Sequence, residues 1–187
     1  MTGQLPDPAT TGSPQTEVPI IATERLRLRE RSVDDAEALF AAMSEPARMT
    51  WWSRAPYTSV AELREDFVAK GGDWRSWAIT RRDDDHAIGF VAAGRRRAGV
   101  SEIGYFLAGE AQGHGFAGEA LTALAAQLFS EGQRRIFADC DPDNLRSIAL
   151  LERLGFTREG RLRGEWHTHI GIRDSLIYGL LADEWRG

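Results

Sequence analysis

Three glycines, Gly113, Gly115 and Gly118, have the G-x-G-x-x-G spacing of a dinucleotide-binding loop. An apolar, strand-like stretch (101–107) precedes them, and a helix-like stretch follows. Asp139 lies about 20 residues further on, where a ribose-binding carboxylate is expected in that fold. Glycines before a helix let a phosphate approach backbone N–H groups that carry partial positive charge. The segment therefore predicts a phosphate site. Which cofactor carries the phosphate has to be inferred from the rest of the sequence.

The surroundings of the loop argue against a dinucleotide. In that fold the first glycine follows the strand directly, whereas residues 108–112 separate Leu107 from Gly113 here. The chain after residue 100 offers two strand–helix units followed by two strands, too few for two βαβαβ halves. No Lys-Ser/Thr pair follows the glycines, so a P-loop is also disfavoured. A different pyrophosphate site and an ordinary glycine-rich turn are the two remaining interpretations.

Four segments together resemble the GNAT superfamily of acyl-CoA-dependent N-acyltransferases, and most closely its RimJ/RimL-like branch. The resemblance covers roughly residues 20–187. Gln112, Gly115 and Ala117 match the acyl-CoA motif Q/R-x-x-G-x-G/A. The four segments are TERLRLRERSVDDAEALF (23–40), SEIGYFLAGEAQGHGFAGEAL (101–121), DPDNLRSIALLERLGF (141–156) and RDSLIYGLLADEW (173–185).

The resemblance implies an α/β (α+β) fold, with a mixed, mostly antiparallel sheet of about seven strands and about four helices. The sheet is expected to splay between strands 101–107 and 134–140, and acetyl-CoA to bind in that opening. Asn144 and Ser147 would lie near the pantetheine arm, which the backbone of Tyr105, Phe106 and Leu107 would hold. The pyrophosphate would lie on a loop formed by Gln112, Gly113, His114, Gly115, Phe116, Ala117 and Gly118.

Acetyl transfer by direct attack on the thioester needs a neutral amine, so a nearby carboxylate must accept a proton. Glu102 is the candidate, because strand alternation places it on the face of Gly104 and Phe106. The alternative is a surface carboxylate paired with an arginine of the neighbouring strand. Ser147 is the candidate donor to the CoA thiolate. Many relatives use a tyrosine near this region, and the sequence reveals none.

Asn144 and Ser147 also fit a purely structural interpretation, an Asn N-cap with Ser at the third helical position. Trp51 and Trp52 are expected to shape the acceptor pocket, built from loops 45–58 and 164–172. The acceptor is expected to be a protein N-terminus or a small-molecule amine. Two alternatives are an antibiotic-modifying or detoxifying enzyme and a non-catalytic acyl-CoA-binding regulatory module.

The pattern of apolar residues predicts the elements that hold these groups. Ser32 is expected to cap the first helix, Pro46 to end it, and Thr58 or Ser59 to cap the second. The single cysteine, Cys140, is expected to be a small buried residue. The expected strands are 24–31, 74–82, 87–94, 101–107, 134–140, 157–163 and 173–181, and the expected helices are 33–45, 60–70, 115–131 and 144–154, with a turn region at 94–99.

The bulk properties are those of one globular domain. The chain has 187 residues and a formal net charge of −5, which gives no indication of nucleic-acid binding. We expect a flexible tail over 1–19 and one domain over 20–187. His167 and His169 lack an evident third ligand, so no metal is expected. No apolar run is long enough for a membrane span, so we expect a cytoplasmic protein, a monomer or homodimer.

Overall fold

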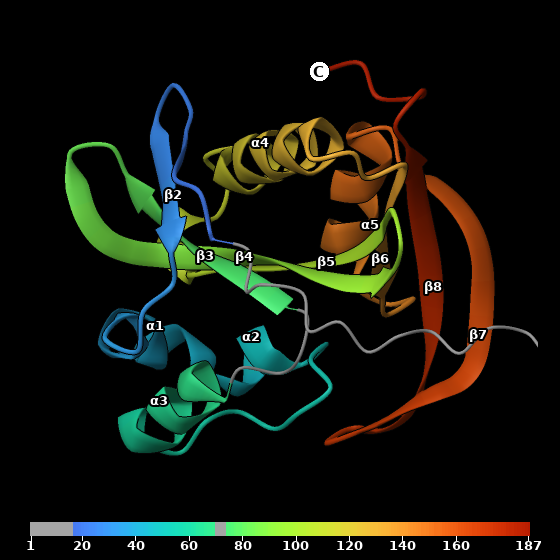
Figure 1. Ribbon diagram of the computed structural model, residues 1–187. Helices are drawn as coiled ribbons and strands as arrows, with labels where there is room; N and C mark the ends of the chain where they lie inside the picture. The colour runs from blue at the N-terminus through green and yellow to red at the C-terminus, as the bar shows by residue number, and fades with distance from the viewer. Residues whose placement is uncertain (1–16, 70–73) are drawn as a thin grey trace, which may run out of the picture.

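A computed structural model describes residues 17–69 and 74–187. Its centre is an eight-stranded sheet in the order β1-β2-β3-β4-β5-β6-β8-β7, in which only β5 and β6 run parallel (Figure 1). The mixed, mostly antiparallel sheet that the sequence predicted is therefore confirmed. The strands are β1 (Ile21–Ala22), β2 (Leu26–Glu30), β3 (Trp74–Arg81), β4 (Asp84–Arg97), β5 (Val100–Leu107), β6 (Arg135–Cys140), β7 (Thr157–Thr168) and β8 (Gly171–Leu181).

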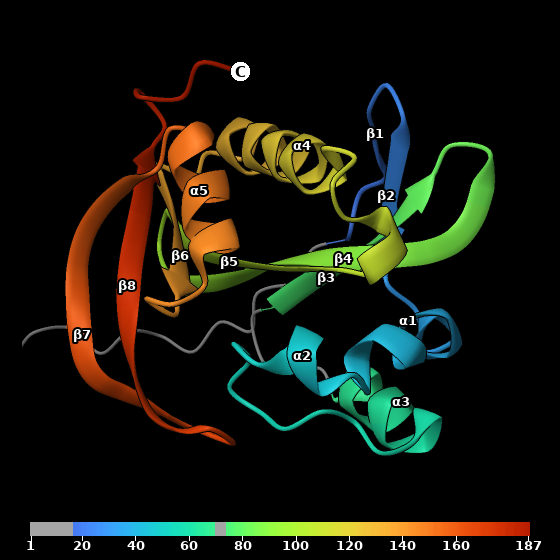
Figure 2. The ribbon, with the colours of Figure 1, turned by 180° about the vertical axis from the view of Figure 1, so that it is seen from behind.

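Helices cover both faces of this sheet. One face carries α4 and α5, and the other carries α1, α2 and α3 (Figures 1 and 2). Each helical layer has its own cluster of buried apolar side chains. The helices are α1 (Asp35–Met43), α2 (Pro46–Met49), α3 (Val60–Val68), α4 (Phe116–Ser130) and α5 (Leu145–Arg153), with a short 3-10 turn η1 (Gly109–Ala111).

The apolar stripe of α4 faces the sheet, as its 3.6-residue periodicity predicted. Leu121, Leu124 and Leu128 are each at most 1% exposed. Burying one leucine side chain contributes roughly 1.5–3 kcal/mol to the free energy of unfolding. This packing fixes the first turn of α4 relative to the end of β5.

The sheet splays between β5 and β6. Their parallel pairing covers only Val100–Glu102 against Arg135–Phe137. Beyond it, β5 stays paired with β4 as far as Leu107, and β6 stays paired with β8 as far as Cys140. The predicted opening is thus present (Figure 2), and it begins immediately after Glu102.

Three local predictions were wrong. Pro46 does not end the first helix but begins α2, where its fixed φ and missing N–H are tolerated. Ser32 does not cap α1; instead its backbone N–H and hydroxyl donate to the carboxylate of Asp35. The arginines expected in a turn at 94–99 extend β4 as far as Arg97.

The second helix begins as predicted, because Ser59 caps α3 by accepting the N–H of Glu62. The helix ends at Val68, and the expected stop at Lys70–Gly72 lies outside the described residues. Most of the expected tail, residues 1–16, also lies outside them. In the described part, the carbonyl of Pro19 accepts the indole N–H of Trp77 at 2.8 Å.

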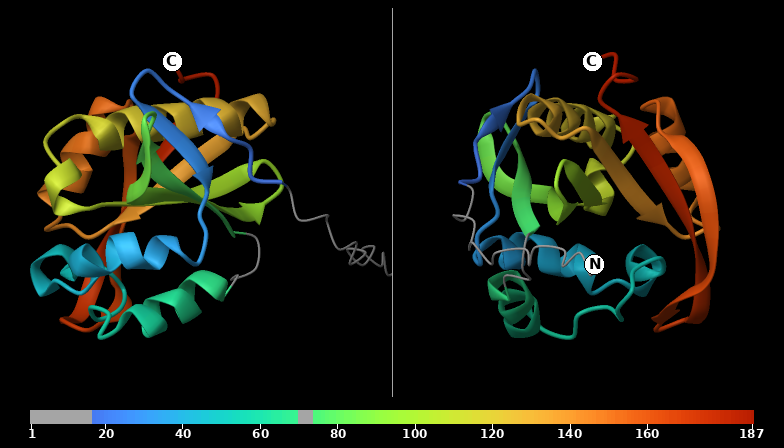
Figure 3. Two further views of the ribbon diagram at one scale, coloured as in Figure 1. Left: turned by 90° about the vertical axis from the view of Figure 1, so that its left-hand side faces the viewer. Right: turned by 45° about the vertical axis from the view of Figure 1, so that its right-hand side comes forward.

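The last two strands are longer than the sequence indicated. The loop expected over 164–172 is mostly strand, because β7 runs to Thr168 and β8 starts at Gly171. The two strands form an arm that extends along the molecule past α2 (Figure 3). The side expected to receive the acceptor is therefore bordered by a strand surface rather than by a loop.

Candidate active site

The glycine-rich loop opens α4 in the geometry of an anion site. Gly113 and Gly115 have φ values of 81° and 80°, in the left-handed region that favours glycine. Helical hydrogen bonding starts when the N–H of Glu119 donates to the carbonyl of Gly115 at 3.1 Å. The N–H groups of residues 116–118 precede that bond and point out of the helix end, with its partial positive charge. A pyrophosphate fits this end of the helix.

Two arginines flank the loop. Arg25, immediately before β2, donates to the carbonyl of His114 at 3.0 Å and pairs with Glu119 at 2.6 Å, so it fixes the loop against the start of β2. Arg146, in the first turn of α5, donates to the side-chain oxygen of Gln112 at 3.1 Å. Sequence reasoning missed Arg146, which brings a cation to the loop from across the opening. His114 stacks on Phe116, with ring centroids 5.7 Å apart.

The open edge of β5 carries the backbone groups expected to hold the pantetheine arm. Gln112 donates its side-chain N–H to the carbonyl of Leu107 at 2.9 Å, which links the loop to the strand end. The carbonyl of Phe106, however, points at β4, because a Cβ built on Gly89 would lie 2.3 Å from it. This corrects the expectation that all three residues 105–107 offer the opening the same backbone groups. Tyr105 and Leu107 remain candidates for that contact.

Tyr105 and Ser147 meet across the opening. The hydroxyl of Tyr105, on β5, hydrogen bonds to the hydroxyl of Ser147, on α5. Burial raises the pKa of Tyr105 above its usual value, so the phenol keeps its proton at neutral pH. A tyrosine hydroxyl, supplied by β5, therefore lies beside Ser147. Strand alternation could have indicated this contact, because Tyr105 lies on the same face of β5 as Ile103 and Leu107. That face packs toward α4 and α5.

Asn144 caps α5. Its side-chain oxygen accepts the N–H of Ser147 at 3.3 Å, which agrees with the structural interpretation of this pair. The cap fixes the first turn of α5 and so positions Ser147 beside Tyr105. Cys140 is buried next to this turn, and burial raises its thiol pKa to about 11. A nucleophilic role for Cys140 is therefore disfavoured.

Glu102 is the last residue of β5 paired with β6, at the base of the opening. Its carboxylate accepts from Arg96 of β4 at 2.5 Å, and its side chain is 14% exposed. The expected alternative, pairing with an arginine of the neighbouring strand, is therefore present. Such a pair can still accept a proton from a nearby amine, because the carboxylate keeps free lone pairs.

Trp51 and Trp52 lie on the face opposite α4. Trp52 packs edge-on against Phe90 and Phe106, with each pair of ring centroids 5.8 Å apart. Trp51 is 38% exposed, and the guanidinium of Arg173 lies 5.6 Å from its ring centroid. The segment after α2 therefore contacts both β5 and β8 from the expected acceptor side.

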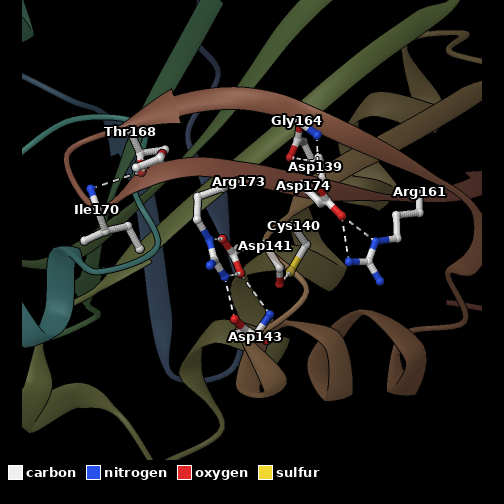
Figure 4. A network of polar contacts seen from close by, with 12 residues as sticks. Asp139, Cys140, Asp141, Asp143, Arg161, Gly164, Thr168, Ile170, Arg173 and Asp174 are labelled. Atoms are coloured by element: carbon white, nitrogen blue, oxygen red, sulfur yellow. Dashed lines mark hydrogen bonds and ion pairs between the residues drawn. The ribbon is translucent and has the colours of Figure 1, made fainter.

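A polar network that the sequence did not reveal connects the end of β6 to β8. Arg173 extends from β8 and bonds both carboxylate oxygens of Asp141, at 2.8 and 2.9 Å, and Asp143 at 2.5 Å (Figure 4). Burial alone would raise the pKa of Asp141, but the hydrogen bonds and charge of Arg173 lower it below its usual value. Arg161 and Asp174 form a separate pair on the hairpin, at 2.6 Å. Arg173 thus holds the turn that leads into α5.

Two hollows in the described surface lie away from the opening. One, of about 630 Å³, lies between α1 and the start of β4, and the other, of about 160 Å³, lies between α1 and η1. Neither is lined by Glu102, Ser147 or the two tryptophans. The candidate active site is therefore identified by the unpaired edge of β5 and the polar groups beside it, and not by the volume of a surface hollow. Within 17–69 and 74–187, no three His, Cys, Asp or Glu side chains are grouped as a metal would require.

Comparison with known proteins agrees with this geometry. A family model described as an acetyltransferase (GNAT) domain matches residues 25–157. A Bacillus licheniformis protein, described as the uncharacterized N-acetyltransferase p20, is 31% identical over 173 residues, which cover 88% of this chain and 97% of the relative.

Two solved structures share the fold. RimL, a ribosomal alpha-N-protein acetyltransferase in complex with coenzyme A, has a TM-score of 0.76 at 24% identity, over 89% of this chain and 99% of that one. A spermidine N-acetyltransferase from Vibrio cholerae, in complex with CoA and spermine, has a TM-score of 0.75 at 22% identity, over 87% and 97%.

The chain belongs to the GNAT family of N-acetyltransferases. It is an acetyl-CoA-dependent enzyme. The chemistry of the opening suits this donor: the α4 loop and Arg146 suit its pyrophosphate, and the open edge of β5 suits its pantetheine. None of the described helices has the length and apolar character needed to cross a membrane.

Proposed function

We propose that the enzyme transfers acetyl to a primary amine that enters from the side of Trp51 and Trp52 and attacks the thioester directly. The observation that carries this is the alignment of three features along the one opening. The α4 loop lies at one end, the Tyr105–Ser147 hydroxyl pair lies within it, and Glu102 lies at its base. Bound acetyl-CoA would supply the activated acyl group.

We assign Glu102 as the proton acceptor for the amine. Its position at the start of the splay is on the face of Phe106, against which Trp52 packs. The guanidinium of Arg96 fixes the orientation of the carboxylate. Backbone N–H groups at the open edge of β5 are the candidate donors for the charge that develops on the thioester oxygen.

We assign Ser147 as the donor to the departing thiolate, with Tyr105 as the proton reserve behind it. A buried phenol with a raised pKa stays protonated, so it can reprotonate the serine hydroxyl through their hydrogen bond. The Asn144 cap keeps the serine in reach of the phenol.

Two acceptor classes fit, a protein N-terminus and a small-molecule amine. RimL is named for the first class and the spermidine acetyltransferase for the second. Thiol release from acetyl-CoA, followed with N-terminal peptides and with small amines in parallel, tests the proposal. Amine-dependent release supports it, whereas CoA binding without release for any amine would favour a non-catalytic acyl-CoA-binding module.

A further inference from the structure

Asp139 lies on β6, just inside the opening. It is two residues beyond Phe137, the last residue of β6 that pairs with β5. Ala138 and Cys140 are buried in the core with α4 and α5, so alternation directs Asp139 to the opposite face. That face also carries Phe106 and Trp52. The carboxylate therefore borders the opening on the acceptor side.

Two neutral donors orient this carboxylate. The indole N–H of Trp166, on β7, donates to it at 2.9 Å, and the hydroxyl of Ser175, on β8, donates to the other oxygen. These bonds fix the position of Asp139 without cancelling its charge. Glu102, by contrast, is paired with the guanidinium of Arg96.

The surrounding charge is negative. Asp139, Asp141 and Asp143 supply three carboxylates at the end of β6, and Arg173 is the cation bound to two of them. Three negative charges and one positive charge leave a net charge of −2 in this group. A cation arriving here gains electrostatic stabilisation, and a second carboxylate is repelled.

Aromatic surface borders the same place. Trp166 is 40% exposed, and its indole touches Asp139 directly. Trp51 already accepts a guanidinium over its ring. Aromatic faces attract cations, and an aromatic group beside a carboxylate is a common way to bind an ammonium group.

We propose that Asp139 and Trp166 form the subsite that receives the acceptor amine in its ammonium form, before proton loss. The same subsite selects against amines that carry a carboxylate beside the amino group, because Asp139 repels it. Peptide N-termini and amino acid amides fit this requirement, and free amino acids do not. The inference rests on the proposed acetyl transfer, whose acceptor class it narrows.

Binding of phenylalanine amide to the enzyme saturated with CoA tests the subsite without turnover. Asp139→Asn keeps an acceptor for Trp166 and a polar partner for Ser175 but removes the charge. Because a hydrogen bond to an ionised group is worth more than a neutral one, the Kd measured by calorimetry should rise about tenfold. Asp174→Asn, which removes a carboxylate on the other side of β8, is the matched control and should leave the Kd unchanged.

Selectivity provides the second measurement. The ratio of kcat/KM for phenylalanine amide to that for phenylalanine should fall about tenfold in Asp139→Asn, while the Kd for CoA stays the same. The two amines differ in basicity, but this difference affects the ratio equally in the wild type and in the variant, so it cancels when the two ratios are compared. Asp139→Glu should recover part of the selectivity.

The outcomes separate the two proposals. An unchanged Kd for the amide together with an unchanged ratio would overturn the subsite. A tenfold weaker Kd without thiol release from wild-type enzyme would support the subsite and contradict the proposed transfer.

Discussion

Tyr105 of β5 and Ser147 of α5 share a hydrogen bond across the opening between β5 and β6. The two residues are 42 positions apart. Tyr105 lies on β5 beyond its pairing with β6, and Ser147 lies on α5, the helix that follows β6. Their contact places two hydroxyl groups beside the path expected for the cofactor thiol. We interpret the pair as the proton source for that thiol.

Removing either hydroxyl should slow acetyl transfer. Ser147→Ala should lower kcat about a hundredfold and Tyr105→Phe about tenfold, since general acid catalysis contributes roughly 10²–10⁴. The double variant should be little worse than Ser147→Ala, because the two groups act in series. Steady-state kinetics measures this, and Ser130→Ala, at the far end of α4, serves as the control. Independent, multiplying effects would contradict a relay.

Glu102→Gln should lower kcat at neutral pH without weakening CoA binding. Because the amide of the variant cannot accept a proton from the amine, the pH dependence of kcat should differ between the variant and the wild type. A pH profile of kcat for both proteins checks this. If the two profiles have the same shape, Glu102 is not the proton acceptor, and its pair with Arg96 is structural.

Arg146→Ala should weaken CoA binding about fivefold, because the guanidinium lies beside the pyrophosphate loop. The difference in the Kd for CoA between the variant and the wild type should shrink at high salt, because salt screens charge–charge attraction at an exposed site. Titration calorimetry at two salt concentrations measures both effects. Arg153→Ala, at the opposite end of α5, is the matched control, and equal losses in the two variants would indicate a non-specific effect of net charge.

The α4 loop could be predicted from local glycine spacing, whereas the splay between β5 and β6 was implied by the family resemblance and not by the residue pattern. The glycines at 113 and 115 need a positive φ, and the amphipathic pattern of α4 determines its buried face. The role of Pro46 was mispredicted because a proline occurs both after the end of a helix and in the first turn of one. The length of β7 was missed because its mostly exposed residues carry no apolar alternation.

The polar contacts of the site could not be predicted, since they join residues distant in sequence. Arg173 meets Asp141 from 32 positions away, and Trp166 meets Asp139 from 27. Both contacts depend on the register of β8 between β6 and β7. A one-residue slip would direct each of these side chains to the other face.

The pH dependence of folding should reveal the pair of Arg29 and Asp35. Burial would raise the pKa of Asp35, but the hydrogen bonds and charge of Arg29, with the N–H of Ser32, lower it below its usual value. A carboxyl with a lower pKa in the folded state contributes stability above its unfolded pKa of about 3.9, and loses it as pH falls through the folded pKa.

Asp35→Asn should therefore lower the free energy of unfolding at pH 7 by about 2 kcal/mol, and its difference from the wild type should narrow as pH falls below about 3.9. Urea unfolding at a series of pH values measures the difference. Glu24→Gln, which removes an exposed carboxylate in the turn between β1 and β2, should change the free energy of unfolding little at any pH. If the difference in the free energy of unfolding between Asp35→Asn and the wild type is the same at all pH values, the pKa of Asp35 is not lowered in the folded state.

Time courses of thiol release from acetyl-CoA, run with and without amine, distinguish acetyl transfer to the amine from CoA binding alone. We expect release that depends on the amine, saturates with it, and yields the acetylated amine in equal amount by mass spectrometry. Release that is independent of amine, or CoA binding with no release for peptides, amino acid amides or small amines, would contradict the proposed transfer.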